Sequence, residues 1–444
     1  MAPFSPITWP PFGISQTVTA TQQALSFPQT VHSSLSAATH GVRPFDGIVS
    51  ISVAAEEAHR RLFNNAKASL GDASGPALPE PAWFRIPWGI DTKSFRPPRN
   101  QREREHGRVR FGLTKFRRII LHLSRLASFD KADWGLVVRL ASALRSQEEV
   151  MVLAGADHQQ YSERLVRATV EAGLSSRLKV IPNADDVMPL YHAADIACAF
   201  GNNIQESQGL SVLEAMACGL PVIASDWDGY RDMVVDGVTG HLIATTVLRD
   251  RGMLWVDSLL GSDVSAGYNV AQLTMVSQDD AERAIQSLCG DLRTARQMGE
   301  AGRRRVEQEF DAKRMMASYG AMWETLGRAA ARDTGQYSAR NIRTEWPDYV
   351  ELFGDAYATR MLETTSVVHA SAASELARDA AVEDLLSMIP MDRGLLKDLL
   401  AVAGGGQQIA VLIRECGRDG DGGEVARAIT WLLRTGSLSV ACAQ

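Results

Sequence analysis

Two carboxylates stand in the spacing E-x7-E within the segment ESQGLSVLE, as Glu206 and Glu214. The first follows an apolar run, and Gly209 allows the backbone to approach a ligand closely. We expect a helix to begin at Leu210 or Ser211, which places the second carboxylate about one turn inside it. The free amides and positive dipole end of such a helix favour a diphosphate, and carboxylates beside it suit sugar hydroxyls.

Two cations form a second candidate group, in the spacing R-x5-K within HLSRLASFDK. Arg125 and Lys131 follow the apolar run IILHLS, so we expect them in a loop at the end of a strand. Two cations in such a loop can neutralise a diphosphate and stabilise it as a leaving group.

His122 and His192 fall within strand and helix patterns, and we expect both to be structural.

The elements that must position these residues alternate along the chain from residue 118 onwards. Apolar runs such as RIILHLSRL, EVMVLAGA and PVIASD alternate with amphipathic segments such as YSERLVRATVEAG and GLSVLEAMACG. This alternation predicts an α/β fold with a parallel, doubly wound sheet. Ligands of such sheets bind beyond the carboxyl ends of the strands, which is where the candidate side chains are expected.

We expect three domains, with boundaries at residues 1–95, 96–330 and 331–444. The first would hold a strand at 46–52 and a helix at 54–68, and the Pro- and Gly-rich segment 87–98 would connect it to the second. The third is predicted to be mainly helical. Its ending EVARAITWLLRTGSLSV is typical of a helix, a glycine turn and a short strand, similar to the end of a winged-helix module.

Composition excludes several classes of protein. The net charge of −6 argues against binding nucleic acid by bulk charge. The five cysteines include no C-x-x-C pair, which is typical of reduced cysteines. The first residues lack the pattern of a secretory signal, and no window reaches the roughly 18 apolar residues of a transmembrane segment. We therefore expect a cytoplasmic protein.

An E-x7-E spacing by itself is usually a chance pair of solvated carboxylates, so the surrounding motifs decide its meaning. The region resembles the retaining glycosyltransferases of the GT-B type in the "glycosyl transferases group 1" family (family 4). The linker usually written IPNGVD…F.P is matched by IPWGIDTKSFRP at 86–97. The family's C-terminal pattern is matched by MGEAGRRRVEQEF at 298–310 and SYGAMWETL at 318–326. The resemblance covers about residues 30–330.

The resemblance implies two Rossmann-like domains and a metal-independent reaction without a cofactor. Glu206 would bind the hydroxyls of the donor sugar and Glu214 those of the ribose, while Arg125 and Lys131 would hold the diphosphate. The remaining residues that it implies are a histidine facing the donor sugar, His32, and the backbone contacts Gly209, Leu210 and Ser211. The partners would be a nucleotide-diphosphate sugar and a glycan, lipid or small-molecule acceptor.

The chain departs from the family pattern in its N-terminal part. Only about 90 residues precede the linker, and the usual opening strand with its Gly-rich loop is not visible. We expect the acceptor-side domain to be incomplete. The favoured function is transfer of a hexosyl unit with retention of configuration. The alternatives are a non-catalytic nucleotide-sugar-binding or partner-dependent subunit, and a nucleotide-sugar epimerase on the same two-domain fold.

Overall fold

The structure is a computed structural model, and it describes most of the chain. The residues described are 12–15, 47–68, 80–127, 131–204, 206–249, 270–332, 358–371, 376–386, 391–417 and 422–441. His32 lies outside the described residues, so its place near the donor sugar stays a prediction.

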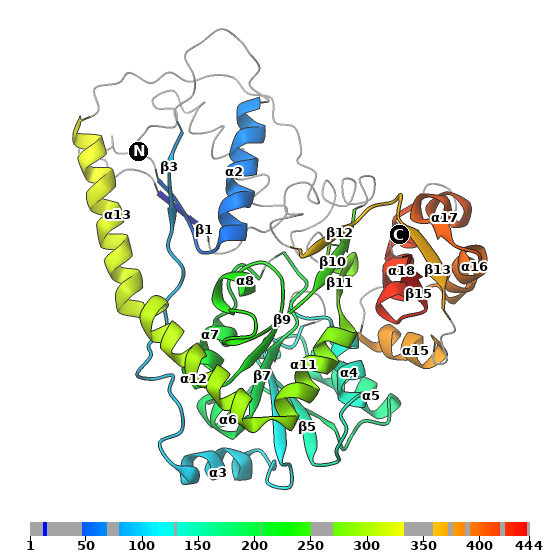
Figure 1. Cartoon of the computed structure of the whole chain (residues 1–444), viewed down its shortest axis with the longest axis horizontal. Coiled ribbons are helices and arrows are strands. Elements are labelled where there is room, and N and C mark those ends of the chain that lie inside the picture. Colours follow the sequence, from blue (N-terminus) through cyan, green and yellow to red (C-terminus); the bar gives the residue numbers. More distant parts are fainter. Residues whose placement is uncertain are drawn as a thin grey trace.

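A parallel six-stranded sheet forms the centre of the molecule (Figure 1). Its strand order is β6-β5-β4-β7-β8-β9, and each neighbouring pair is parallel. The strands are β4 (Arg118–Leu123), β5 (Glu149–Gly155), β6 (Leu178–Pro182), β7 (Ile196–Ala199), β8 (Val222–Ser225) and β9 (Gly240–Ile243). The chain runs outward from β4 to one edge and then from β7 to the other. The predicted doubly wound sheet is confirmed, and its switch point lies between β4 and β7.

Helices cover both faces of this sheet, which explains why its strands are nearly continuous apolar runs. Ile120 packs in one core with Leu136 and Leu165, whereas the adjacent Leu121 packs in the opposite core with Val212. The helices of this part are α3 (Gln101–Arg110), α4 (Trp134–Ser142), α5 (Tyr161–Glu171), α6 (Met188–Ala193), α7 (Leu210–Ala217), α8 (Tyr230–Met233), α11 (Gln278–Gly290) and α12 (Leu292–Glu309).

A smaller parallel sheet lies in the N-terminal part, in the order β1-β2-β3. Its strands are β1 (Phe12–Ser15), β2 (Gly47–Ser50) and β3 (Ala82–Arg85), and α2 (Val53–Ala68) follows β2. The long helix α13 (Ala312–Arg332) leaves the central part and runs alongside this sheet (Figure 1). Its residues Tyr319, Met322 and Leu326 pack against Val49 and Ile86.

The chain therefore passes between the two parts twice, and the two passages are joined. The amide of Ile90 donates to the carbonyl of Phe310 at 2.9 Å, and the amide of Ala312 donates to the carbonyl of Ile90 at 3.0 Å. These bonds hold the linker that follows β3 against the start of α13.

The C-terminal part is mainly helical and packs beside the central sheet (Figure 1). One small sheet, in the order β11-β10-β12, joins β12 of this part to two strands that precede α11, and another has the order β14-β13-β15. The strands are β10 (Thr245–Leu248), β11 (Thr274–Val276), β12 (Arg360–Leu362), β13 (Val367–Ala370), β14 (Gln407–Gln408) and β15 (Leu438–Val440). The helices are α15 (Leu376–Leu386), α16 (Arg393–Ala403), α17 (Ile409–Cys416) and α18 (Gly422–Arg434). The helix, turn and strand predicted for the final segment are confirmed by α18 and β15.

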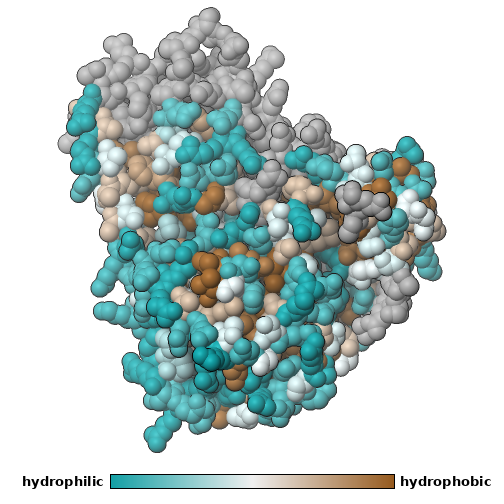
Figure 2. All heavy atoms as spheres, in the orientation of Figure 1, coloured by the Kyte–Doolittle hydropathy of each residue, from teal (hydrophilic) through white to brown (hydrophobic). Residues whose placement is uncertain are grey.

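A shared core joins the C-terminal part to the rest of the chain. Leu396, Ile429 and Leu432 lie in one buried cluster with Ile204 and Trp227, which belong to loops of the central sheet. The face of the molecule in Figure 2 is mostly hydrophilic around a central apolar area. None of the described helices is both long enough and apolar enough to cross a membrane.

Candidate functional site

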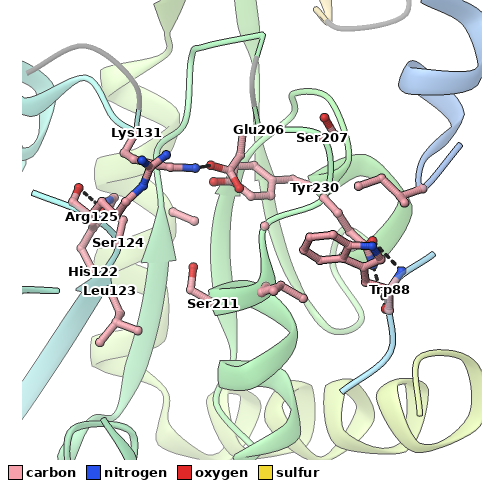
Figure 3. Close-up of a pocket in the computed structure, with 15 residues that line it drawn as sticks. Trp88, His122, Leu123, Ser124, Arg125, Lys131, Glu206, Ser207, Ser211 and Tyr230 are labelled. Carbon is pink, nitrogen blue, oxygen red and sulfur yellow. Dashed lines mark hydrogen bonds and ion pairs between the residues drawn. The ribbon is translucent and has the colours of Figure 1, made fainter. Parts of the chain in front are cut away.

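A cavity of about 420 Å³ opens at the switch point of the central sheet (Figure 3). Its walls come from the loops after β4 and β7, the start of α7, and the linker after β3. This is the location that the strand order predicts for a ligand. The lining residues are Ile51, Trp88, His122, Leu123, Ser124, Arg125, Lys131, Ala199, Glu206, Ser207, Gln208, Gly209, Leu210, Ser211 and Tyr230.

The start of α7 forms one wall of the cavity. Gly209 precedes the helix with φ of +77°, and no side chain caps the helix N-terminus. A Cβ at this position would lie 2.3 Å from Cε1 of Tyr230, so only glycine fits. The helix begins at Leu210, as predicted, and both Leu210 and Ser211 line the cavity. The uncapped helix start therefore faces the space where an anion would bind.

Lys131 and Arg125 lie close to Glu206 in the cavity wall. The Nζ atom of Lys131 lies 2.7 Å from Oε2 of Glu206, and both side chains are largely buried, at 17% and 11% exposure. Arg125 lies beside Lys131 on the same side of the cavity (Figure 3). The structure thus brings together three charged residues that the sequence singled out, from two loops far apart in the chain.

Glu214 lies elsewhere, behind the first turn of α7. Its Oε2 accepts a hydrogen bond of 2.7 Å from the hydroxyl of Tyr191, which also lies 3.3 Å from the carbonyl of Ser211. Burial raises the pKa of the Glu214 carboxyl above its ordinary value. The residue is not among those described as lining the cavity. A contact between Glu214 and a ribose stays a prediction.

The histidine of β4 borders the cavity, although the sequence pattern predicts a structural role. His122 is 2% exposed and packs against Trp134 and Phe200. Burial lowers the pKa of its imidazole to about 4, so the ring is neutral at pH 7. These contacts confirm the structural role, and its ring contributes an uncharged part of the wall.

Sequence reasoning missed an aromatic side of the cavity. The carboxamide of Gln208 accepts from the amide of Trp88 at 2.7 Å and donates to the carbonyl of Trp88 at 3.0 Å. Tyr230 is 3% exposed and lies beneath Gly209. Burial, and next the charge of Glu206, raises the pKa of the Tyr230 phenol well above its ordinary value. Tyr230 follows the strand in PVIASD. Because ligands of parallel sheets lie beyond the strand ends, this position could have been predicted to border the site.

A second buried acid lies close to the cavity, at Asp228. This residue is 1% exposed and has φ of +45°. Neither of its carboxyl oxygens has a hydrogen-bond partner among the described residues. Burial is the main cause that raises the pKa of Asp228 well above its ordinary value, followed by the charges of Glu206 and Asp232. These surroundings favour the protonated form of the Asp228 carboxyl group.

Comparison with known proteins agrees with this geometry. Residues 117–250 match the family model described as "Glycosyl transferases group 1". This region is similar to the group 1 glycosyltransferases. It contains the cavity-lining residues that follow β4 and β7, including Arg125, Lys131 and Glu206.

Curated relatives match part of the chain. A D-inositol 3-phosphate glycosyltransferase of Salinispora tropica is 29% identical over 197 residues, which are 41% of this chain and 40% of the relative. The enzyme of the same name from Mycobacterium tuberculosis (strain H37Ra) is 31% identical over 160 residues, 35% of this chain and 32% of the relative. The match thus spans less than half of the length of these glycosyltransferases.

Solved structures share the fold. A sucrose-phosphate synthase from Thermosynechococcus elongatus matches with a TM-score of 0.50 and 19% identity, over 72% of this chain and 68% of that chain. A glycosyltransferase from Rickettsia africae matches with a TM-score of 0.50 and 17% identity, over 71% of this chain and 70% of that chain. The predicted GT-B type α/β fold with a helical C-terminal region is confirmed.

Proposed function

We propose that the chain binds a nucleotide-diphosphate sugar in this cavity and transfers its hexosyl unit to an acceptor hydroxyl with retention of configuration. The observation that carries the proposal is the meeting of an uncapped helix start, two cations and a carboxylate at the switch point of the sheet. The match of residues 117–250 to the group 1 glycosyltransferase family model supports it.

The diphosphate would lie against the first amides of α7, at Leu210 and Ser211. Arg125 and Lys131 would offset its charge from the opposite wall. In this structure Lys131 is paired with Glu206. A bound diphosphate offers Lys131 a second anion, which leaves an oxygen of Glu206 able to accept a hydrogen bond from a sugar hydroxyl.

The transfer breaks the bond between the anomeric carbon and the diphosphate oxygen. A new bond forms from the acceptor oxygen to the same face of that carbon, and the acceptor proton passes to the departing diphosphate. Negative charge grows on the diphosphate as the bond breaks, so cations placed beside it stabilise the transition state more than the ground state. This scheme uses the side chains of the chain and assigns no metal.

The test is calorimetric titration of the full chain with UDP and with a panel of nucleotide sugars. Lys131→Met is expected to weaken UDP binding by roughly tenfold to a hundredfold, the usual contribution of a charged hydrogen bond. Lys313→Met, which removes an exposed lysine of α13, is the matched control and should bind as the wild type does.

Release of the nucleoside diphosphate from the preferred nucleotide sugar, measured in a coupled assay with added acceptors, separates an enzyme from a binding protein. A folded wild-type chain that binds no nucleotide would contradict the proposal. Binding without turnover for any acceptor would favour the non-catalytic alternative.

A further inference from the structure

Trp88 lies in the linker that joins the two α/β parts, and it lines the cavity. Figure 3 places it on the side away from Arg125 and Lys131, with Glu206 between them. Ile51, from the N-terminal part, lines the cavity too. The cavity therefore has a cationic end and an apolar, aromatic end.

The backbone of Trp88 is held from two directions. Gln208 pairs with both its amide and its carbonyl, which ties Trp88 to the residue that precedes Gly209. On the other side, a Cβ at Gly89 would lie 2.7 Å from Cα of Ala312, so the linker packs tightly against the start of α13. The backbone of Trp88 is thus held at a set position relative to the start of α7, and the residue lines the cavity.

An indole offers a broad, rigid apolar face and has only two side-chain torsions to fix on binding. Sugar rings present one face of C–H groups, which can pack on such a surface while their hydroxyls remain hydrogen-bonded. The proposed leaving group occupies the cationic end and the transferred sugar lies at Glu206. The aromatic end is the side from which an acceptor can reach the anomeric carbon.

We propose that Trp88 is the acceptor platform, and that it selects an acceptor whose accepting unit is a sugar ring, stacked by its C–H face on the indole. This assignment rests on the proposed function, because the proposed function decides which end of the cavity holds the donor. Gln208 acts as a positioning residue, because it holds the backbone from which the Trp88 indole projects.

The experiment is saturation-transfer NMR on the full chain with methyl glycosides of glucose, mannose and galactose, each with and without saturating UDP. We expect the C–H protons of one ring face to receive most of the saturation. Trp88→Ala should weaken glycoside binding by about tenfold and leave the UDP affinity unchanged, with Trp88→Phe in between. Trp323→Ala, which removes a half-exposed indole on α13, should change neither.

Three outcomes would overturn the proposal. Glycoside binding that is unchanged in Trp88→Ala would show that the indole is not the platform. A loss of UDP affinity in the same variant would place the donor at this end. Binding of inositol 3-phosphate with no methyl glycoside bound, with or without UDP, would assign a different acceptor class. A wild-type chain that binds a glycoside through Trp88 but no UDP would instead refute the proposed function and leave Trp88 as a sugar-binding residue without an acceptor role.

Discussion

Acidic side chains with different surroundings lie next to one another around the proposed diphosphate site. Glu206 is paired with Lys131 at 2.7 Å, whereas the nearby Asp228 is buried with no hydrogen-bond partner for its oxygens among the described residues. Such surroundings favour the neutral form of the carboxyl group, because its charged form would be desolvated and would repel Glu206. The site thus pairs the charge of Glu206 with Lys131 and disfavours a second negative charge beside it.

The raised pKa of Asp228 predicts a pH-dependent stability. The folded chain keeps a proton on this carboxyl that the unfolded chain releases above its ordinary value of 3.8. The wild type therefore loses stability as the pH rises from that value towards the raised pKa, by at most about 1.4 kcal/mol per pH unit. Asp228→Asn cannot titrate, so its free energy of unfolding relative to the wild type should increase across this window.

Urea unfolding at a series of pH values checks this prediction. Asp291→Asn is the control, because hydrogen bonds from Thr294 lower the pKa of the exposed Asp291. The free energy of unfolding of this variant relative to the wild type should therefore fall, and not increase, as the pH rises. If the free energies of unfolding of Asp228→Asn and the wild type change with pH in parallel, the Asp228 carboxyl group ionises normally.

At the scale of elements, the short helix α7 depends on the glycine before it. Gly209 has φ of +77° and lies against the ring of Tyr230, and this arrangement lets the helix begin directly beside Glu206. The start of helix α4 likewise positions the loop that carries Lys131. Its N-cap Asp133 accepts from the amide of Leu136 at 2.9 Å, which holds the segment that follows Lys131. Two helix starts thus position the two charged loops.

Gly209→Ala tests the first of these helix starts. The positive φ alone should cost about 1 kcal/mol, and the new methyl group would also meet the Tyr230 ring 2.3 Å away. Gly173→Ala is the matched control, since Gly173 has φ of +70° but no atom within 4 Å of a Cβ. We expect the control to lose only the backbone contribution and to bind UDP normally. Equal loss of stability, with UDP affinity unchanged in both variants, would contradict the argument.

At the scale of the whole molecule, a buried arginine adds polar contacts to the shared core that joins the C-terminal part to the loops near the cavity. Arg434 of α18 donates to the carbonyls of Ala271 and Thr274, and its Nε lies 3.7 Å from Oδ2 of Asp133. Asn202, in the loop that leads to Glu206, donates to the same Ala271 carbonyl at 3.1 Å. Residues 358–441 are therefore part of the scaffold of the site.

Arg434→Gln should destabilise the chain by roughly 3–5 kcal/mol, because it leaves buried Asp133 without its nearest cation. Burial by itself would raise the pKa of Asp133, and Arg434 followed by Arg139 keeps that pKa below its ordinary value. Calorimetric and chemical unfolding measure the change, and UDP titration should show weaker binding. Arg414→Gln, at a position whose side chain is 73% exposed, should behave as the wild type. An unchanged stability, or a separate transition for the C-terminal part, would show that this part is independent.

The sequence by itself determined the central sheet and most of the charged side of the site. Apolar runs and helical periods are local patterns, and the rule that ligands lie beyond parallel strand ends is general, so Arg125, Lys131, Glu206 and the start of α7 could be predicted to lie together. Their roles remain proposals, and His32 lies outside the described residues.

Only the tertiary structure decided which distant segments meet. The packing of α13 on the N-terminal sheet, the clamp of Gln208 on Trp88, and the attachment of α18 to the cavity loops all join residues far apart in the chain. Burial is likewise a property of the assembled core, and it separates Asp228 and Glu214 from the ion-paired Glu206. No local pattern records such contacts, because their free energy arises from surfaces that come together only when the whole chain folds.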